Sequence, residues 1–205
     1  MKYINEFHQL NCAPDVLEIV NPMGKKPAKE ITESMAVMRA IKRRIFVMRK
    51  RYGKIGLLDL CAGNALTSVL AVHLFPDVYA IAIDKRERQR KWERADRFEY
   101  DFYDIYEPMP SRGIPYIICS VHCCGNLAKR VIEIYQADPL AQHLVMMPCC
   151  NGTVPNNNAT KSRGKILSKY ELWVDYLAGL CDGFYYADDD CISPKNMIIV
   201  ASKTT

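Results

Sequence analysis

The sequence predicts an α/β fold in which a mostly parallel, seven-stranded sheet carries helices and ends in an antiparallel hairpin. From residue 55 onward, short apolar runs alternate with segments of helical periodicity, which is typical of parallel strands joined by helical crossovers. The two last strand candidates, 184–187 and 197–201, are separated by a segment too short for a helical crossover, so we expect them to pair antiparallel. The composition, with 49% hydrophobic and 25% charged residues among 205, is that of an ordinary globular chain.

The first 52 residues form an extension that precedes the sheet. Prolines and a glycine interrupt residues 1–29, which predicts an irregular lead-in. From residue 30 to 52, apolar residues recur every three or four positions, which predicts a helix with one buried stripe that closes at Gly53. We therefore expect an N-terminal extension with a basic amphipathic helix over 1–52 and the main domain over 53–205.

The remaining elements follow in a regular order. Before the final hairpin, the predicted strands are 55–61, 78–83, 98–102, 116–121 and 144–147. The predicted helices are 64–75, 85–96, 126–136 and 166–181. The polar, asparagine-rich stretch 151–165 predicts a mobile loop. Ligands of such folds gather at the carboxyl ends of the parallel strands, so the residues that follow each strand are the candidates for function.

The turn after the first strand is the most informative motif. Residues 57–65 read LLDLCAGNA, a buried strand followed by a turn of small residues. Asp84 ends the next strand 21 residues after Gly63, close to the spacing of about 20 at which an acid reaches the ribose hydroxyls of a nucleotide-like cofactor. A dinucleotide fingerprint needs three glycines and this turn has one, so a pyrophosphate would lose much of its backbone cradle. S-adenosylmethionine, which has no phosphate, suits this turn better.

The same turn resembles motif I of class I methyltransferases, with Cys61 in place of a common glycine. Two further segments, 120–127 (SVHCCGNL) and 147–151 (MPCCN), resemble a narrower family. That family comprises the eukaryotic tRNA acceptor-stem ribose 2′-O-methyltransferases and the methyltransferase-like proteins related to them. The resemblance covers about residues 55–151 and implies a Rossmann-like class I methyltransferase fold, S-adenosylmethionine as cofactor and a tRNA-like substrate. The Cys/His zinc-binding segments of the acceptor-stem enzymes are absent from the sequence.

The resemblance also implies which residues bind the cofactor. Asp84 takes the place of the ribose-binding acid. Asp101 falls where such enzymes contact the adenine amine, and Asp104 is the second choice for that contact. The complete set of cofactor-binding candidates is Asp59, Cys61, Ala62, Gly63, Asn64, Asp84, Lys85, Asp101, Asp104 and Ser120.

A cysteine-rich pair of strand ends supplies the catalytic candidates. His122, Cys123 and Cys124 end the fourth strand, and Cys149 and Cys150 follow the fifth, so the two groups converge if these strands are neighbours. Three interpretations stay open: an acceptor pocket in which His122 orients the substrate or acts as general base, a zinc site with unusually adjacent ligands, or small buried hydrophobic residues. A nucleophilic Cys149 is a further option. We take His122, Cys123 and Cys149 as catalytic and assign no metal.

Positive charge is concentrated in two segments. The net charge of the chain is +5, whereas residues 39–51 alone carry seven basic residues and no acid, and residues 85–97 carry seven basic and three acidic residues. An anionic partner such as RNA accounts for this pattern, as would two solvated helix faces. The nine cysteines, an odd number without an export signal, predict free thiols in the cytoplasm. No apolar run approaches the roughly 20 residues of a membrane span.

These observations together predict an S-adenosylmethionine-dependent methyltransferase that acts on RNA through segments 39–51 and 85–97. The alternatives are a methyltransferase of protein or of a small molecule, a non-catalytic nucleic-acid-binding module that retains the fold, and a nicotinamide oxidoreductase.

Overall fold

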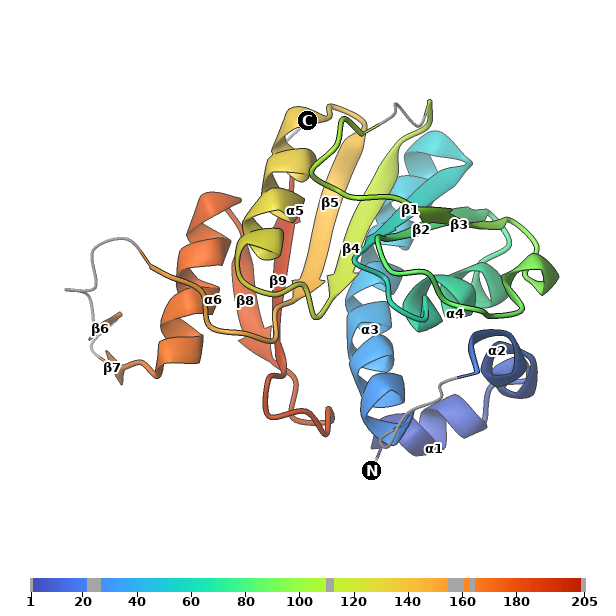
Figure 1. Cartoon of the computed structure of the whole chain (residues 1–205), viewed down its shortest axis with the longest axis horizontal. Coiled ribbons are helices and arrows are strands. Elements are labelled where there is room, and N and C mark those ends of the chain that lie inside the picture. The colour runs from blue at the N-terminus through green and yellow to red at the C-terminus, as the bar shows by residue number, and fades with distance from the viewer. Residues whose placement is uncertain (1, 22–26, 110–112, 155–160, 163–164, 204–205) are drawn as a thin grey trace.

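The strands of the computed structural model form one seven-stranded sheet with the order β3-β2-β1-β4-β5-β9-β8 (Figure 1). The structure describes residues 2–21, 27–109, 113–154, 161–162 and 165–203. The first five strands in this order, β3, β2, β1, β4 and β5, are parallel to one another. Strand β9 runs antiparallel to both β5 and β8. The predicted architecture, a mostly parallel sheet with an antiparallel C-terminal hairpin, is confirmed.

The strands lie close to their predicted positions because each is a short apolar run. They are β1 (Ile55–Leu60), β2 (Val78–Asp84), β3 (Phe98–Phe102), β4 (Tyr116–Val121), β5 (Ala141–Met147), β8 (Phe184–Ala187) and β9 (Met197–Ser202). Every residue of β1 is buried, as expected for a central strand covered on both faces.

Helices cover both faces of the sheet, and side chains alternate between two cores. On one face, Ile55 and Leu57 pack with residues from α3 (Pro27–Tyr52) and α4 (Leu66–Leu74). On the other, Leu58 and Leu60 pack with residues from α5 (Asn126–Ala137) and α6 (Lys169–Leu180). A separate two-stranded ribbon pairs β6 (Lys161–Ser162) with β7 (Lys165–Ile166). Much of the predicted 151–165 loop lies outside the described residues.

The irregular lead-in expected over residues 1–29 is wrong, because this part contains α1 (Lys2–His8) and α2 (Ala13–Val20). Pro14 lies in the first turn of α2, where proline interrupts no hydrogen bond of the helix. Tyr3 and Phe7 of α1 join the core on the α3 face of the sheet. The Tyr3 hydroxyl also donates to Asp188 Oδ2 at 2.6 Å, which connects the N-terminal helices to the C-terminal hairpin.

The helix predicted over 85–96 is also wrong. This segment is a loop with one short 3₁₀ turn, η1 (Trp92–Arg94). Its charged residues lack the apolar stripe with which a helix would pack on the sheet. Instead, its arginines contact the turn after β1, and Lys91 and Arg94 contact Glu18 of α2. Among the described helices, none is long and apolar enough to cross a membrane.

Candidate active site

The turn between β1 and α4 has an unusual backbone. Cys61, Gly63 and Ala65 have φ angles of 61°, 57° and 59°, in the left-handed region that costs a residue with a side chain on the order of 1–3 kcal/mol. The Ala62 N–H donates to the Ile83 carbonyl at 3.0 Å and so holds the turn against the end of β2. Strained residues of this kind cluster where a fold binds a ligand.

Asp84, the last residue of β2, accepts hydrogen bonds from the turn after β1 and from Arg86. Its Oδ2 accepts from the Gly63 N–H at 2.9 Å, and its Oδ1 accepts from the Arg86 N–H at 2.9 Å and Arg86 Nε at 3.1 Å. Burial alone would raise the pKa of Asp84, but the hydrogen bonds from Arg86 and Gly63 lower it. Asp84 is therefore an ionised acceptor, suited to the hydroxyl groups of a ribose.

Asp59 lies deeper, in the last part of β1. Ser68 of α4 donates to Asp59 Oδ2 at 2.8 Å, while Asp59 Oδ1 is buried without a hydrogen-bond partner among the described residues. Burial raises the pKa of Asp59 to about 7, against the opposing effect of the Ser68 hydrogen bond. This acid thus carries an unsatisfied acceptor directly beneath the turn.

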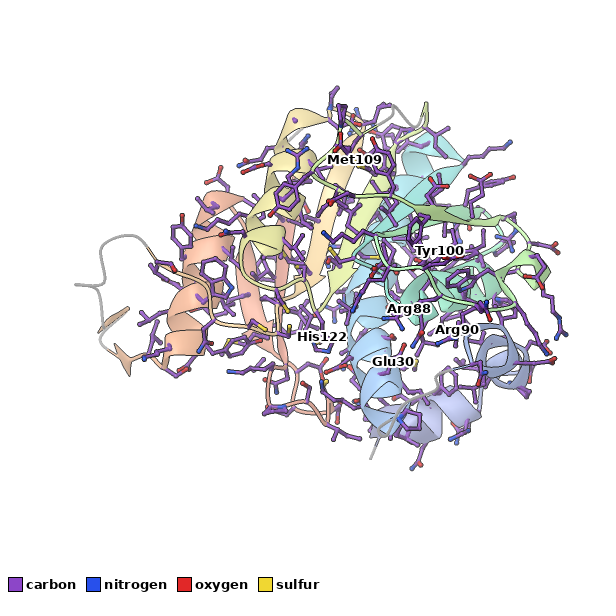
Figure 2. The ribbon with its side chains drawn as sticks, viewed as in Figure 1. Glu30, Arg88, Arg90, Tyr100, Met109 and His122 are labelled. Atoms are coloured by element: carbon purple, nitrogen blue, oxygen red, sulfur yellow. The ribbon has the colours of Figure 1, made fainter. Side chains whose placement is uncertain are left out.

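Asn64 connects the turn to Glu30 of α3 and to Arg88 and Arg90 of the arginine-rich loop. Figure 2 labels these three partners. Its Nδ2 donates to Glu30 Oε1 of α3 at 3.0 Å. Its Oδ1 accepts from Arg90 Nη2 at 2.9 Å and from Arg88 Nη1 at 3.4 Å. The Tyr100 hydroxyl of β3 donates to the carbonyl of Gly63 at 2.9 Å, so side chains from α3, the arginine-rich loop and β3 hold this turn.

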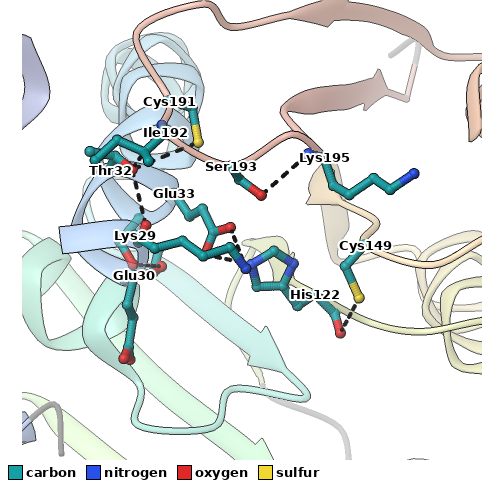
Figure 3. A network of polar contacts seen from close by, with 12 residues as sticks. Lys29, Glu30, Thr32, Glu33, His122, Cys149, Cys191, Ile192, Ser193 and Lys195 are labelled. Carbon is teal, nitrogen blue, oxygen red and sulfur yellow. Dashed lines mark hydrogen bonds and ion pairs between the residues drawn. The ribbon is translucent and has the colours of Figure 1, made fainter. Parts of the chain in front are cut away.

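A carboxylate–imidazole pair faces the turn (Figure 3). His122 Nε2 lies 2.5 Å from Glu33 Oε2, and Glu33 is buried on α3. Burial favours a raised pKa for Glu33, but contact with His122 reverses this effect and lowers it. Lys29 Nζ lies 3.2 Å from Glu33 Oε1. His122 itself has a φ of 67°, a further strained residue beside the same turn.

The two cysteine groups converge as predicted, because β4 and β5 are parallel neighbours. The Sγ atoms of Cys124 and Cys149 are 2.8 Å apart, and Cys150 Sγ lies 3.1 Å from that of Cys124. Hydrogen bonds from Cys124 and Cys149 lower the pKa of Cys150. Cys123 is different: it is buried in the core beneath α5 and α6, and burial raises its pKa to about 12.

A cavity of about 320 Å³ lies between α3, the turn after β1 and the end of β4. Its lining includes six of the predicted site residues: Asp59, Cys61, Ala62, Gly63, Asn64 and His122. It also includes residues that sequence reasoning missed: Lys29, Glu30, Glu33, Ser34, Thr67, Arg86 and Arg88. Glu33 and Ser34 could have been found from the sequence, because a carboxyl and a hydroxyl side chain there interrupt the buried apolar face of α3.

The other predicted cofactor residues are not among the residues that line this cavity. Lys85 and Asp104 form an exposed ion pair at 3.4 Å after the ends of β2 and β3. Asp101 is half-buried within β3, in register with Ile83 of β2. Ser120 is fully buried in β4 and donates to the Leu60 carbonyl at 2.7 Å, so it joins β4 to β1.

Residues 26–157, more than half of the chain, match a family model described as a methyltransferase domain. The chain belongs to this methyltransferase-domain family. No curated protein matches the sequence.

Solved methyltransferase structures share the fold at low sequence identity. The methyltransferase domain of bacterial CtHen1-CN is 11% identical with a TM-score of 0.52, over 83% of this chain and 100% of that one. The plantazolicin methyltransferase BpumL, in complex with a pentazolic desmethylPZN analog and SAH, is 11% identical with a TM-score of 0.52, over 96% and 92% of the chains. The sugar N-methyltransferase KedS8 from Streptoalloteichus is 16% identical with a TM-score of 0.51, over 85% and 87%. The protein thus has the predicted Rossmann-like methyltransferase fold, and its family makes it a methyltransferase of the S-adenosylmethionine-dependent class.

Proposed function

We propose that this protein transfers a methyl group from S-adenosylmethionine to RNA, in the cavity between α3 and the ends of β1 and β4. The observation that carries the proposal is the Glu33–His122 pair, which lies in the same cavity as the motif I turn. Donor-binding and acceptor-binding groups are thereby within one small volume, which is the main requirement of a reaction whose methyl donor is already activated.

The residues of the cavity suit S-adenosylmethionine. Asp84, which accepts a hydrogen bond from Gly63 of the turn, would accept hydrogen bonds from the ribose hydroxyls, and the turn over 61–64 would let the cofactor approach the backbone. Glu30 would be an anionic group for the cationic amino and sulfonium groups of the cofactor, and Asp59, whose pKa of about 7 leaves it partly protonated, would offer its unpaired Oδ1 as a hydrogen-bond acceptor. Lys29 and Arg88 are cations for its carboxylate. Lys85, Asp104 and Asp101 would contact the adenine end of the cofactor.

His122 holds the acceptor and takes its proton, and Glu33 is the positioning residue that orients the imidazole. When bound, the cofactor supplies a methyl group on a positively charged sulfur. A correctly placed base contributes about 10²–10⁴ to such a rate. The proposal assigns no chemical step to Cys123, which is buried in the core away from the cavity lining.

The distribution of basic residues favours RNA over a small acceptor. The basic segment 39–51 lies on the same helix as Glu33, and Arg51 is about 27 Å farther along the helix axis at 1.5 Å per residue. An acceptor that contacts both the cavity and this basic segment must be extended and anionic. In segment 85–97, basic side chains already contact protein groups, such as Arg86 with Asp84 and Arg94 with Glu18. In segment 39–51, Arg49 is paired with Asp77, so the other basic residues of this segment carry the proposed contact.

The test is methyl incorporation from labelled S-adenosylmethionine into total RNA. For the wild type, we expect nuclease-sensitive label. For His122→Asn and Glu33→Gln, we expect a kcat at least about 100-fold lower with little change in cofactor affinity. Asp84→Ala should bind the cofactor more weakly. Glu6→Gln, on α1, is the matched control and should behave as wild type.

Each other outcome contradicts a defined part of the proposal. Label that enters only protein or small molecules would show that RNA is not the acceptor. Cofactor binding without turnover on any fraction would indicate a non-catalytic module. Calorimetry that detects no binding of S-adenosylmethionine to the wild type would overturn the function as a whole.

A further inference from the structure

Three thiols close to His122 take no part in the proposed methyl transfer. Cys124 follows β4, and Cys149 and Cys150 follow β5. Because Val121 of β4 lies in register with Met147 of β5, both turns leave the sheet at the same edge. Within the described part of the chain, these three residues form a group of potential metal ligands whose sulfur atoms all lie within 4.8 Å of one another.

We propose that Cys124, Cys149 and Cys150 bind one thiophilic divalent cation, Zn²⁺, through three thiolates, with a fourth coordination position open to solvent. Three sulfur ligands select zinc over magnesium or calcium, which prefer oxygen. Three protein ligands with an open fourth position are a common arrangement for zinc in proteins. The sequence spacing alone disfavours this site, since Cys149 and Cys150 are adjacent, but Cys124 completes the group from another strand.

The geometry requires only small movements. Zinc–sulfur bonds of about 2.3 Å in a tetrahedral site place sulfur atoms about 3.8 Å apart. The three Sγ–Sγ distances are 2.8, 3.1 and 3.4 Å, so each pair must separate by about 1 Å or less. Cys124 and Cys150 are exposed and Cys149 is half-buried, so rotation about their side-chain bonds supplies this movement and solvent reaches the open position.

The environment of the group suits the charge of the complex. Three thiolates and one Zn²⁺ leave a single negative charge, and Lys195 and Arg86 are the nearby cations whose charges act on Cys150 and Cys124. The sulfur atoms of Cys124 and Cys149 also lie 3.4 and 3.5 Å from the His122 carbonyl. An ion held here would therefore fasten the strained turn that carries His122 to the end of β5.

The test is metal analysis of the protein purified under reducing conditions, followed by replacement of the metal with Co²⁺. We expect one equivalent of zinc, and intense thiolate-to-cobalt charge-transfer absorption after replacement. Cys124→Ser, Cys149→Ser and Cys150→Ser should each weaken metal affinity at least tenfold. Cys12→Ser, a half-buried thiol next to α2, is the matched control and should keep full metal content.

Three results would overturn the site. They are the absence of stoichiometric zinc with no uptake of added Zn²⁺, equal metal content in the cysteine variants and the wild type, and thiol titration showing a disulfide within the group in place of metal. Circular dichroism and S-adenosylmethionine binding of each variant report separately on folding and on the cofactor site. A failed metal site thus leaves the proposed methyl transfer untouched.

Discussion

At the scale of single residues, Asp84 has two roles that compete. The acid is the proposed acceptor for the ribose hydroxyls, yet both of its oxygens accept hydrogen bonds from Arg86. The Arg86 side chain is 66% exposed, so water and salt screen this ion pair and it contributes about 1 kcal/mol or less. Cofactor binding therefore has to displace a weak internal partner of Asp84.

We accordingly expect Arg86→Ala to tighten S-adenosylmethionine binding by up to about fivefold, the equivalent of about 1 kcal/mol. The measurement is the Kd from titration calorimetry at two salt concentrations, because screening reduces the competition. Arg94→Ala, which removes an exposed ion pair with Glu18, should leave the Kd unchanged. A Kd that weakens tenfold in Arg86→Ala would mean that Arg86 contacts the cofactor itself.

The candidate site could be predicted from the sequence only where its residues follow a strand. The 59–64 turn, Asp84 and His122 belong to local motifs of this kind. Residues 61–64 and His122 line one cavity, and Asp84 accepts a hydrogen bond from Gly63 of the turn. Glu33 and Arg86 depend on contacts between elements. Glu33 comes close to His122 only because α3 packs over the end of β4, and no local pattern encodes that crossing.

At the scale of elements, the loop over 85–97 is held by side chains and not by a helix. Trp92 stacks on Tyr100 with ring centroids 3.5 Å apart and planes at 8°, and its Nε1 donates to the Asn64 carbonyl at 3.3 Å. Arg88 and Arg90 add contacts to Asn64. The helix prediction failed because these tertiary contacts stabilise the loop by more than the helix propensity of its charged residues stabilises a helix.

Trp92→Ala should therefore release this loop. The lost stacking and burial amount to about 1–3 kcal/mol, and the basic residues of the loop then become open to trypsin. Limited proteolysis with the cleavage sites mapped by mass spectrometry should show new cuts between 85 and 94, with weaker cofactor binding. Tyr79→Ala, an exposed aromatic on β2, is the control. Equal protection of the loop in wild type and variant would contradict the assigned role of Trp92.

The strands after residue 55, and the helices there other than the one expected over 85–96, were predictable because their apolar runs report directly on burial. The two N-terminal helices were not, because each is too short to show a clear period and proline obscures the start of α2. Their stability comes from burial of residues such as Phe7 and Val16 in the core of the α3 face, which is a property of the assembled molecule.

At the scale of the whole molecule, the burial of Asp59 lowers the free energy of unfolding when this acid is ionised. Burial raises the pKa of this acid to about 7 from its ordinary value of 3.8. A raised pKa means that its contribution to folding is fully favourable below pH 3.8 and is lost as the pH rises through about 7. Between pH 5 and pH 8, the cofactor-free protein should therefore lose about 3 kcal/mol of unfolding free energy through this group.

Asp59→Asn should remove that loss, because the amide does not ionise. Urea unfolding of the cofactor-free proteins at pH 5 and pH 8 measures this difference. Relative to wild type, the variant should gain about 3 kcal/mol of unfolding free energy between the two pH values. Asp77→Asn is the control with the opposite sign. The hydrogen bond from Arg49 lowers the pKa of Asp77, so its contribution disappears only in more acidic solution and its variant should be destabilised equally at pH 5 and pH 8. If wild type and Asp59→Asn lose the same unfolding free energy between these pH values, burial does not raise the pKa of Asp59 in the folded protein.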